Sequence, residues 1–192
     1  MEKINNILMV GVGGQGIILA SNILSLTAMK AGYDIKKSEI HGMSQRGGSV
    51  FSHIRYGNEI HSPVIPKGKA DILFALEALE VLRWREYTTP DTQIIYLQNY
   101  LKPSMVKEYP AGVDAEIKRI FNNVISIDPK VIKEQTGNVK VQNVALIGTL
   151  SKYTNLSEAN YLAAIKELVP PHTFETNKLA FELGKNINEE AV

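Results

Sequence analysis

The 192-residue chain contains no cysteine, and this absence excludes several kinds of chemistry. A chain without thiolates cannot form disulfides, use a cysteine nucleophile or hold an ordinary iron–sulfur cluster, because cysteine sulfur binds the irons of such clusters. The four histidines, at positions 41, 53, 61 and 172, form neither an HxxxH nor an HExxH pair, so no metal site is expected. Any redox metal in the system must therefore belong to another polypeptide.

The sequence also lacks an excess of one charge and a long apolar run. Its 21 basic and 20 acidic residues give a formal net charge of +1, which argues against a protein built to bind nucleic acid or an acidic membrane. No apolar stretch reaches the roughly 18 residues of a membrane-spanning helix, and residues 1–6 lack the pattern of a signal peptide. We therefore expect a cytoplasmic protein without a nucleic-acid or membrane partner.

Short apolar runs alternate with helical patterns along the chain, and neither a linker nor a repeat divides it. This order predicts one α/β domain over residues 1–192, with a Rossmann-like, mostly parallel sheet flanked by helices and a β-hairpin excursion. The hairpin is expected between 49–56 and 59–62, because Gly57-Asn58 is a turn signal. The other strands are expected at 4–10, 33–39, 70–76, 93–97 and 124–127. Helices are expected between Gly16 and Gly32, from Asp128-Pro129, over 158–168 with Ser157 as its N-cap, and over 77–87, 114–121, 141–152 and 174–188.

The first of two glycine-rich elements directly follows the first apolar run. It reads Gly11-Val12-Gly13-Gly14-Gln15-Gly16, and a glycine turn between a buried strand and a helix aims backbone N–H groups at an anion. Gly11, Gly13 and Gly16 match the dinucleotide fingerprint GxGxxG, for which Glu39 or Asp34 would hold a ribose. Four interpretations stay open: a nicotinamide or flavin dinucleotide, a phosphate-bearing ligand, the backbone of a partner, or only a tight strand–helix turn.

The second element, residues 41–48, follows the next predicted strand and adds a fixed positive charge. Its candidate site residues are His41, Ser44, Gln45, Arg46, Gly47 and Gly48. The Arg46 guanidinium can pair bidentately with phosphate or carboxylate, whereas the alternative is an ordinary surface loop with one solvated arginine. Because we expect both elements to follow adjacent strands of a parallel sheet, they should emerge together at its carboxyl edge, where such sheets bind ligands.

Few other residues are candidates for chemistry. Gln142-Asn143 precede a predicted helix, where Asn143 either offers its amide to a ligand or serves as the helix N-cap. His53 and His61 are interpreted as strand side chains rather than ligands. There is no GxSxG elbow, no Ser-His-Asp arrangement and no Walker motif, since alanine follows Gly68-Lys69. No residue of this chain is therefore expected to perform redox chemistry unaided.

Four segments, taken together and in order, resemble one protein family. They are GVGGQGI, SEIHGMSQRGGSVFSHIRYG, HSPVIPKGKADILFALEALE and VQNVALIGTL. They are similar to the gamma-type domain of 2-oxoacid:ferredoxin oxidoreductases and, within that family, to the small (beta) subunits of the enzymes that act on indolepyruvate. The resemblance covers residues 4 to about 183, with no departure in the glycine elements.

The resemblance implies a complex that converts an aryl 2-oxoacid such as indolepyruvate, coenzyme A and oxidised ferredoxin into an aryl-acetyl-CoA, carbon dioxide and reduced ferredoxin. Thiamine diphosphate and iron–sulfur clusters would lie on a large alpha subunit, and this chain would bind no cofactor alone and be inactive alone. Both glycine elements would face the large subunit and receive a phosphate-bearing group, with coenzyme A favoured over thiamine diphosphate. Arg46 would supply charge, Gly13, Gly14 and Gly48 would supply N–H groups, and Asn143 would orient amides.

Several alternatives to this assignment remain. Subunits of the pyruvate, 2-oxoglutarate and branched-chain enzymes share the same segments. A stand-alone dinucleotide-binding oxidoreductase would use the same glycine turn, and a non-catalytic binding module would use both elements only for docking. An exposed partner face would also allow the isolated chain to form a homodimer.

Overall fold

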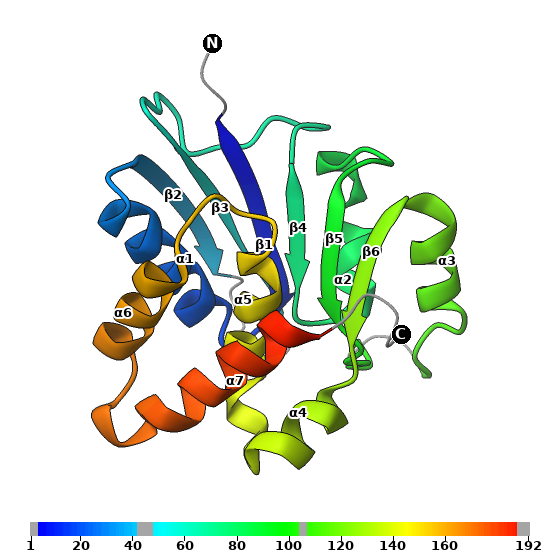
Figure 1. Cartoon of the computed structure of the whole chain (residues 1–192). Helices are drawn as coiled ribbons and strands as arrows, with labels where there is room; N and C mark the ends of the chain where they lie inside the picture. The colour runs from blue at the N-terminus through cyan, green and yellow to red at the C-terminus, as the bar shows by residue number, and fades with distance from the viewer. Residues whose placement is uncertain (1–3, 42–47, 104–106, 188–192) are drawn as a thin grey trace.

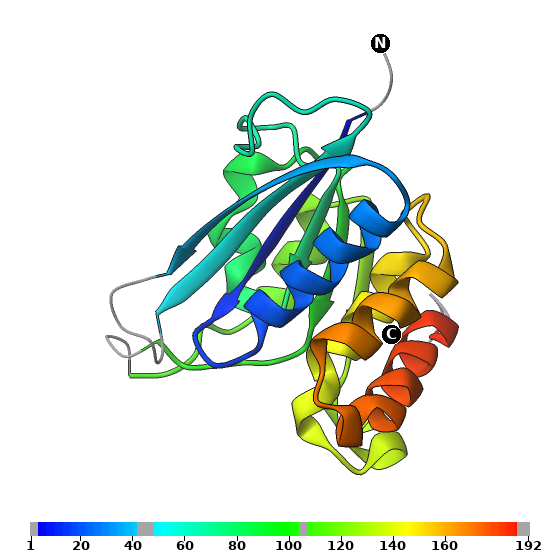
Figure 2. The same cartoon turned by 90° about the vertical axis from the view of Figure 1, so that its left-hand side faces the viewer.

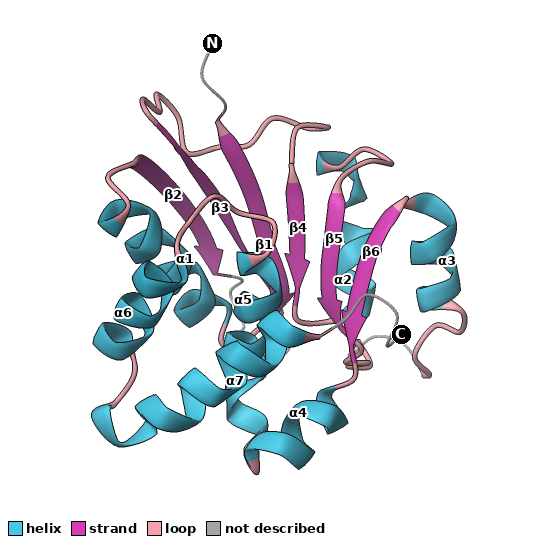
Figure 3. Cartoon of the chain, viewed as in Figure 1, coloured by secondary structure: helices cyan, strands magenta, loops and turns pink. Residues whose placement is uncertain are grey.

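The computed structural model describes residues 4–41, 48–103 and 107–187, which form a six-stranded sheet with helices on both sides (Figure 1). The strands are β1 (Asn5–Val12), β2 (Asp34–His41), β3 (Ser49–Gly57), β4 (Ile72–Ala75), β5 (Gln93–Leu97) and β6 (Asn123–Ile127), in the order β2-β3-β1-β4-β5-β6. The helices are α1 (Ile17–Lys30), α2 (Ala78–Arg83), α3 (Val113–Ile120), α4 (Pro129–Thr136), α5 (Gln142–Ser151), α6 (Glu158–Leu168) and α7 (Phe174–Asn186). Short 3₁₀ helices are η1 (Arg85–Tyr87), η2 (Val139–Val141) and η3 (Pro171–Thr173). The predicted α/β class is confirmed (Figure 3).

Both faces of β1 are apolar, because a layer of helices covers each face of the sheet. Successive side chains of a strand point to opposite faces, so Ile7 and Met9 pack in a core with α1, α5, α6 and α7, whereas Leu8 and Val10 pack with α2 and α3. Figures 1 and 2 show α1 and α5 against one face of the sheet, with α6 and α7 outside them, and α2 and α3 on the other face. Burial of both faces of β1 explains why the apolar run before the first glycine element is uninterrupted.

The expected hairpin between residues 49–56 and 59–62 is wrong. β3 is an inner strand that pairs antiparallel with β1 on one side and with β2 on the other, so the hairpin is β2–β3. Residues 58–62 form no strand. The backbone of this segment is hydrogen-bonded to a side chain rather than to a neighbouring strand, since Ile60 N donates to Asp34 Oδ2 at 2.7 Å.

The strand directions bring both glycine elements to one edge of the sheet. β1 is parallel to β4, β4 to β5, and β5 to β6. β1 and β2 are both antiparallel to β3 and so run in the same direction, with their carboxyl ends at the lower edge in Figure 1. The expectation that these two strands are adjacent is wrong, because β3 lies between them. The carboxyl edge therefore carries the turn after β1, the start of β3 and the ends of β4, β5 and β6.

The outer helix α7 contacts α5 through the backbone of both helices. A Cβ atom on Gly148 would lie 2.0 Å from the Phe181 carbonyl oxygen, and one on Gly184 would lie 1.7 Å from the Ala145 carbonyl oxygen. Thr149 Oγ1 also donates to the Gly184 carbonyl oxygen at 2.8 Å. Only glycine permits so close an approach, so the two glycines set where α7 crosses α5.

Helix ends follow the local signals of the sequence. Ser157 caps α6 by accepting from Asn160 N, as expected, and Asp128 caps α4 by accepting from Lys130 N. Gly32, just past the end of α1, has a φ of 85°. None of the helices in the described ranges combines the length and apolar character needed to cross a membrane.

Candidate functional site

The turn after β1 is joined directly to the start of β3. Gly14 and Gly16 adopt φ values of 99° and 86°, the left-handed region that favours glycine. Gly13 N donates to the Gly48 carbonyl oxygen at 2.9 Å, so the two glycine elements touch through their backbones. The Gly13 N–H, which we expected to face a ligand, is therefore used within the chain.

Amide side chains from three segments and two backbone carbonyl groups surround this turn in what we call the amide ring. Its side chains are those of Gln15, Asn99, Gln142 and Asn143, and its carbonyl oxygens are those of Leu76 and Gly16. Gln15 Nε2 (2.8 Å) and Asn99 Nδ2 (3.1 Å) both donate to the Leu76 oxygen. Asn99 Nδ2 also donates to Gln142 Oε1 at 3.3 Å, and Asn143 Nδ2 donates to the Gly16 oxygen at 3.1 Å. The ring ties the turn to the ends of β4 and β5 and to the first turn of α5.

Asn143 belongs to the scaffold of the turn. It is 3% exposed, and a Cβ atom on Gly16 would lie 2.5 Å from its Nδ2 atom. Its Oδ1 atom accepts from Val144 N at 3.0 Å. The N-cap of α5 is Val141, so the interpretation of Asn143 as the N-cap is wrong. The amide is instead held between the glycine turn and the first turn of α5.

The turn keeps backbone donors that no described residue uses. Across residues 4–41, 48–103 and 107–187, the N–H groups of Gly14 and Gly16 have no acceptor, and Gly14 is exposed. Gly16 is the N-cap of the 14-residue helix α1, whose first turn has neither an acidic residue nor a side-chain cap. The positive end of a helix dipole and free N–H groups favour an anion. The described geometry therefore suits a phosphate or carboxylate group.

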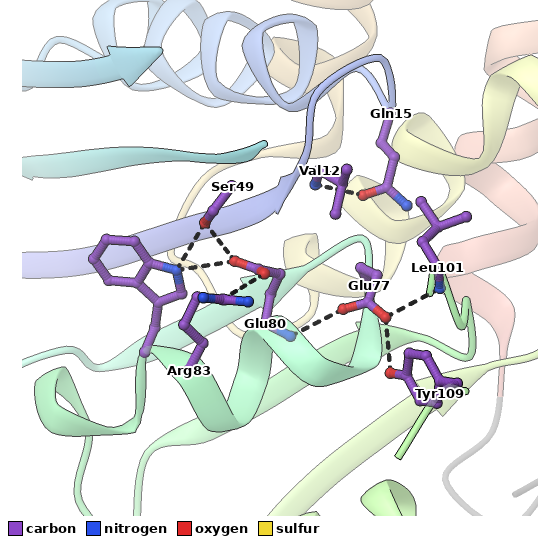
Figure 4. A network of polar contacts seen from close by, with 9 residues as sticks. Val12, Gln15, Ser49, Glu77, Glu80, Arg83, Leu101 and Tyr109 are labelled. Carbon is purple, nitrogen blue, oxygen red and sulfur yellow. Dashed lines mark hydrogen bonds and ion pairs between the residues drawn. The ribbon is translucent and has the colours of Figure 1, made fainter. Parts of the chain in front are cut away.

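Two buried carboxylates that belong to no motif of the sequence lie near the turn (Figure 4). Glu77 is 1% exposed and Glu80 is 3% exposed. Glu77 is the N-cap of α2 and accepts hydrogen bonds from Glu80 N (3.0 Å), Leu101 N (3.3 Å) and the Tyr109 hydroxyl (2.7 Å). Burial raises the pKa of Glu77 above its ordinary value. This carboxyl group thereby holds the segment after β5 against the start of α2.

Glu80 extends this network to β3. It accepts hydrogen bonds from Ser49 Oγ (2.5 Å), Trp84 Nε1 (3.1 Å) and Arg83 Nε (2.8 Å). Ser49 directly follows Gly48, whose carbonyl oxygen holds Gly13, so Glu80 fixes the start of β3 beside the turn. The only sequence signal was a pair of glutamates three residues apart after a buried strand, which equally describes an ordinary helix start.

The carboxylates expected to hold a dinucleotide ribose have other partners. Glu39 Oε1 accepts from Ser21 Oγ at 2.7 Å and pairs with Lys37 Nζ at 2.6 Å. Asp34 accepts from Ile60 N at the opposite end of β2. A dinucleotide fold also places its first two strands side by side, whereas β3 separates β1 from β2 here. These contacts disfavour the nicotinamide or flavin interpretation.

Part of the second glycine element lies outside the described residues. Ser44, Gln45, Arg46 and Gly47 belong to this part. His41 ends β2, where its backbone lies opposite Val50. Within the described ranges, no group of three histidine, aspartate or glutamate side chains is placed to hold a metal ion.

Residues 6–187 match the family model described as pyruvate ferredoxin/flavodoxin oxidoreductase. The indolepyruvate oxidoreductase subunits IorB of Thermococcus kodakarensis and Pyrococcus horikoshii are 36% and 37% identical to this chain, and each alignment covers 96% of this chain and 96% of the relative. The 2-oxoglutarate synthase subunit KorC of Methanothermobacter thermautotrophicus is 28% identical, over 97% of this chain and 96% of the relative.

Solved structures share the fold. The pyruvate oxidoreductase subunit PORC of Thermotoga maritima has a TM-score of 0.71 at 20% identity, with 95% of both chains covered. The 2-oxoglutarate:ferredoxin oxidoreductase of Magnetococcus marinus, with 2-oxoglutarate, coenzyme A and succinyl-CoA bound, has a TM-score of 0.73 at 17% identity. That alignment covers 98% of this chain but 32% of the longer chain, so the same fold occurs alone and as part of a larger polypeptide.

Proposed function

This chain belongs to the pyruvate ferredoxin/flavodoxin oxidoreductase family, and from that premise we propose that it is the small subunit of an indolepyruvate:ferredoxin oxidoreductase. The complex joins indolepyruvate to coenzyme A, releases carbon dioxide and passes the two electrons set free to ferredoxin, giving indole-acetyl-CoA. The observation that carries the proposal is the match to IorB subunits, at 36% and 37% identity over 96% of both chains. A 2-oxoglutarate-oxidising complex is the second candidate, because KorC aligns over a similar length at 28% identity.

In the proposed complex, which lies in the cytoplasm, the chemistry is divided between two subunits. When bound to a large alpha subunit, thiamine diphosphate and iron–sulfur clusters supply the carbanion and electron chemistry. This chain has no cysteine to hold such clusters, so its part is to bind and orient. The isolated chain is therefore inactive, and ferredoxin reaches it only through the complex.

We place a phosphate group of coenzyme A on the turn after β1. The free N–H groups of Gly14 and Gly16 and the N-terminus of α1 support this placement, because all three favour negative charge. Arg46 supplies a full positive charge from the neighbouring element, and Gly48 a further N–H group. Thiamine diphosphate on the partner is the second candidate for this position.

Anaerobic purification of the tagged chain from its own host tests the proposal. We expect a large second band, a brown colour with broad absorbance near roughly 400 nm, and ferredoxin reduction that requires both indolepyruvate and coenzyme A. Preference for 2-oxoglutarate in the same assay would favour the second candidate. A colourless single band would indicate a stand-alone binding module, and a yellow single band a flavin protein.

A further inference from the structure

We propose that Asn99 and Gln142 form a second part of the ligand site, which binds the amide groups of the pantetheine arm of coenzyme A. This inference rests on the proposed function, because it takes coenzyme A as the ligand. It adds a subsite to a phosphate site that would otherwise bind any nucleotide.

The two side chains are fixed in position before any ligand binds. Asn99 follows β5, and its Nδ2 atom donates to both the Leu76 carbonyl oxygen (3.1 Å) and Gln142 Oε1 (3.3 Å). The backbone oxygen of Asn99 accepts from Ala78 N at 3.0 Å, which holds the residue against the start of α2. Gln142 is the first residue of α5. Both residues are half-buried at the carboxyl edge, so a ligand can reach them.

Each member of the pair keeps one polar group that no described residue uses. The Asn99 Oδ1 atom has no donor, and the Gln142 Nε2 atom has no acceptor, within the described part of the chain. One bonded pair therefore presents an acceptor and a donor. These complement the N–H group of one secondary amide and the C=O group of another, since the two groups of a single trans amide point in opposite directions. Burying these groups against a ligand that lacks either function would leave one of them unpaired, at a cost in affinity.

The subsite adjoins the phosphate-binding turn. Gln15 and Asn99 donate to the same carbonyl oxygen, that of Leu76, and Gln15 lies between the two glycines with free N–H groups. A molecule with phosphate at one place and amides farther along its chain can therefore contact both. Coenzyme A has this order of groups, with two secondary amides between its diphosphate and its thiol.

The carboxylate of the 2-oxoacid fits this pair less well. A carboxylate would accept from Gln142 Nε2, but it has no hydrogen to offer to Asn99 Oδ1 and would be repelled by that oxygen. No cation belongs to the amide ring, so the negative charge would also lack a partner there. The chemistry of the pair thus favours an amide over an acid.

The experiment compares Gln142→Met with the wild type in the intact complex. Methionine keeps the length of the side chain but removes the donor, while Asn99 retains its bond to Leu76. Gln142→Glu is the second variant, because it keeps an oxygen to accept from Asn99 while it replaces the donor with a charged oxygen, which also repels phosphate groups on the neighbouring turn. Gln98→Met is the matched control, since Gln98 lies at the same edge but donates to Ser126 Oγ (2.9 Å) outside the amide ring.

We expect both Gln142 variants to raise the KM for coenzyme A about five- to tenfold, the effect of one lost hydrogen bond. The KM for indolepyruvate and the kcat at saturation should stay unchanged. In the uncharged variant Gln142→Met, the inhibition constant of adenosine 3′,5′-bisphosphate, which has phosphates but no pantetheine, should also stay unchanged. For Gln142→Met, an unchanged KM for coenzyme A, a raised KM for indolepyruvate, or an equal rise in the bisphosphate inhibition constant would each overturn the proposal. A wild-type complex without coenzyme A-dependent activity would instead refute the proposed function.

Discussion

At the scale of single residues, His53 shows how burial changes an ionisable side chain. It is 4% exposed in β3, between the rings of Phe51 and Tyr87, and its Nδ1 atom accepts from Ile65 N at 3.3 Å. Burial lowers the pKa of His53 below its ordinary value of 6.5. The folded protein therefore keeps this imidazole neutral at a pH where the unfolded chain protonates it.

We expect the free energy of unfolding to fall as the pH drops below 6.5, because the unfolded chain then takes up a proton that the folded protein refuses. His53→Asn, whose Oδ1 atom can accept from Ile65 N, should flatten this slope between about pH 7.5 and pH 5. Urea unfolding across that range measures the effect. His61→Asn is the control for the loss of an exposed imidazole. Equal slopes for the wild type and His53→Asn would contradict the prediction.

Arg46 is the charged residue of the proposed phosphate site. Because a charge-assisted hydrogen bond to phosphate is worth about 1.5–3 kcal/mol, Arg46→Ala should raise the KM for coenzyme A at least about tenfold in the intact complex. Arg119→Ala is the matched control, since Arg119 pairs with Glu116 on the surface of α3 and should leave the KM unchanged. If the two variants behave alike, Arg46 has no part in binding coenzyme A.

At the scale of elements, the close crossing of α5 and α7 predicts that glycine-to-alanine substitutions there destabilise the protein, although helix propensity alone predicts the opposite. Alanine is better than glycine in a helix by about 1 kcal/mol, yet Gly148→Ala and Gly184→Ala each place a Cβ atom inside a backbone group of the other helix. We expect each variant to lose about 3 kcal/mol of unfolding free energy, the upper end of overpacking effects.

Urea unfolding at constant pH measures this loss. Leu179→Ala on the same helix is the control, because Leu179 is 45% exposed and its truncation should change stability by less than about 0.5 kcal/mol. Stability equal to or above the wild type in either glycine variant would show that the helices can separate slightly without loss.

The elements that the sequence predicted well are those set by local signals. The cap at Ser157 and the strand at Gln93–Leu97 depend on neighbouring residues only, and both are confirmed. The hairpin was wrong because the turn signal at Gly57-Asn58 says nothing about pairing, and β3 takes its partners from β1 and β2.

The candidate site was predictable only where glycine spacing marks it. The two glycine elements were found in the sequence, and the fold brings the ends of both to one edge. The bond from Asn143 to Gly16 spans 127 residues and that from Ser49 to Glu80 spans 31 residues. No spacing rule signals such pairs, so the amide ring and the buried glutamates became visible only in the fold.

At the scale of the whole molecule, the chain is expected to work only with its large subunit. Neither subunit purified alone should reduce ferredoxin with indolepyruvate and coenzyme A, whereas mixing them anaerobically should restore the rate of the intact complex. The measurement is ferredoxin reduction before and after mixing. Full activity of the large subunit alone would contradict the prediction and would indicate that this chain serves only for docking.

The backbone contact between α5 and α7 connects the glycine turn to the outer layer of helices. Asn143 links the glycine turn to the first turn of α5, and Gly148 rests on the backbone of α7 at Phe181. We therefore expect an event that stiffens the turn to stiffen α7, in the outer layer of helices, through α5. Amide hydrogen exchange along α7 should slow when the turn is occupied, so deuterium uptake there can follow binding without a label or an assay of turnover.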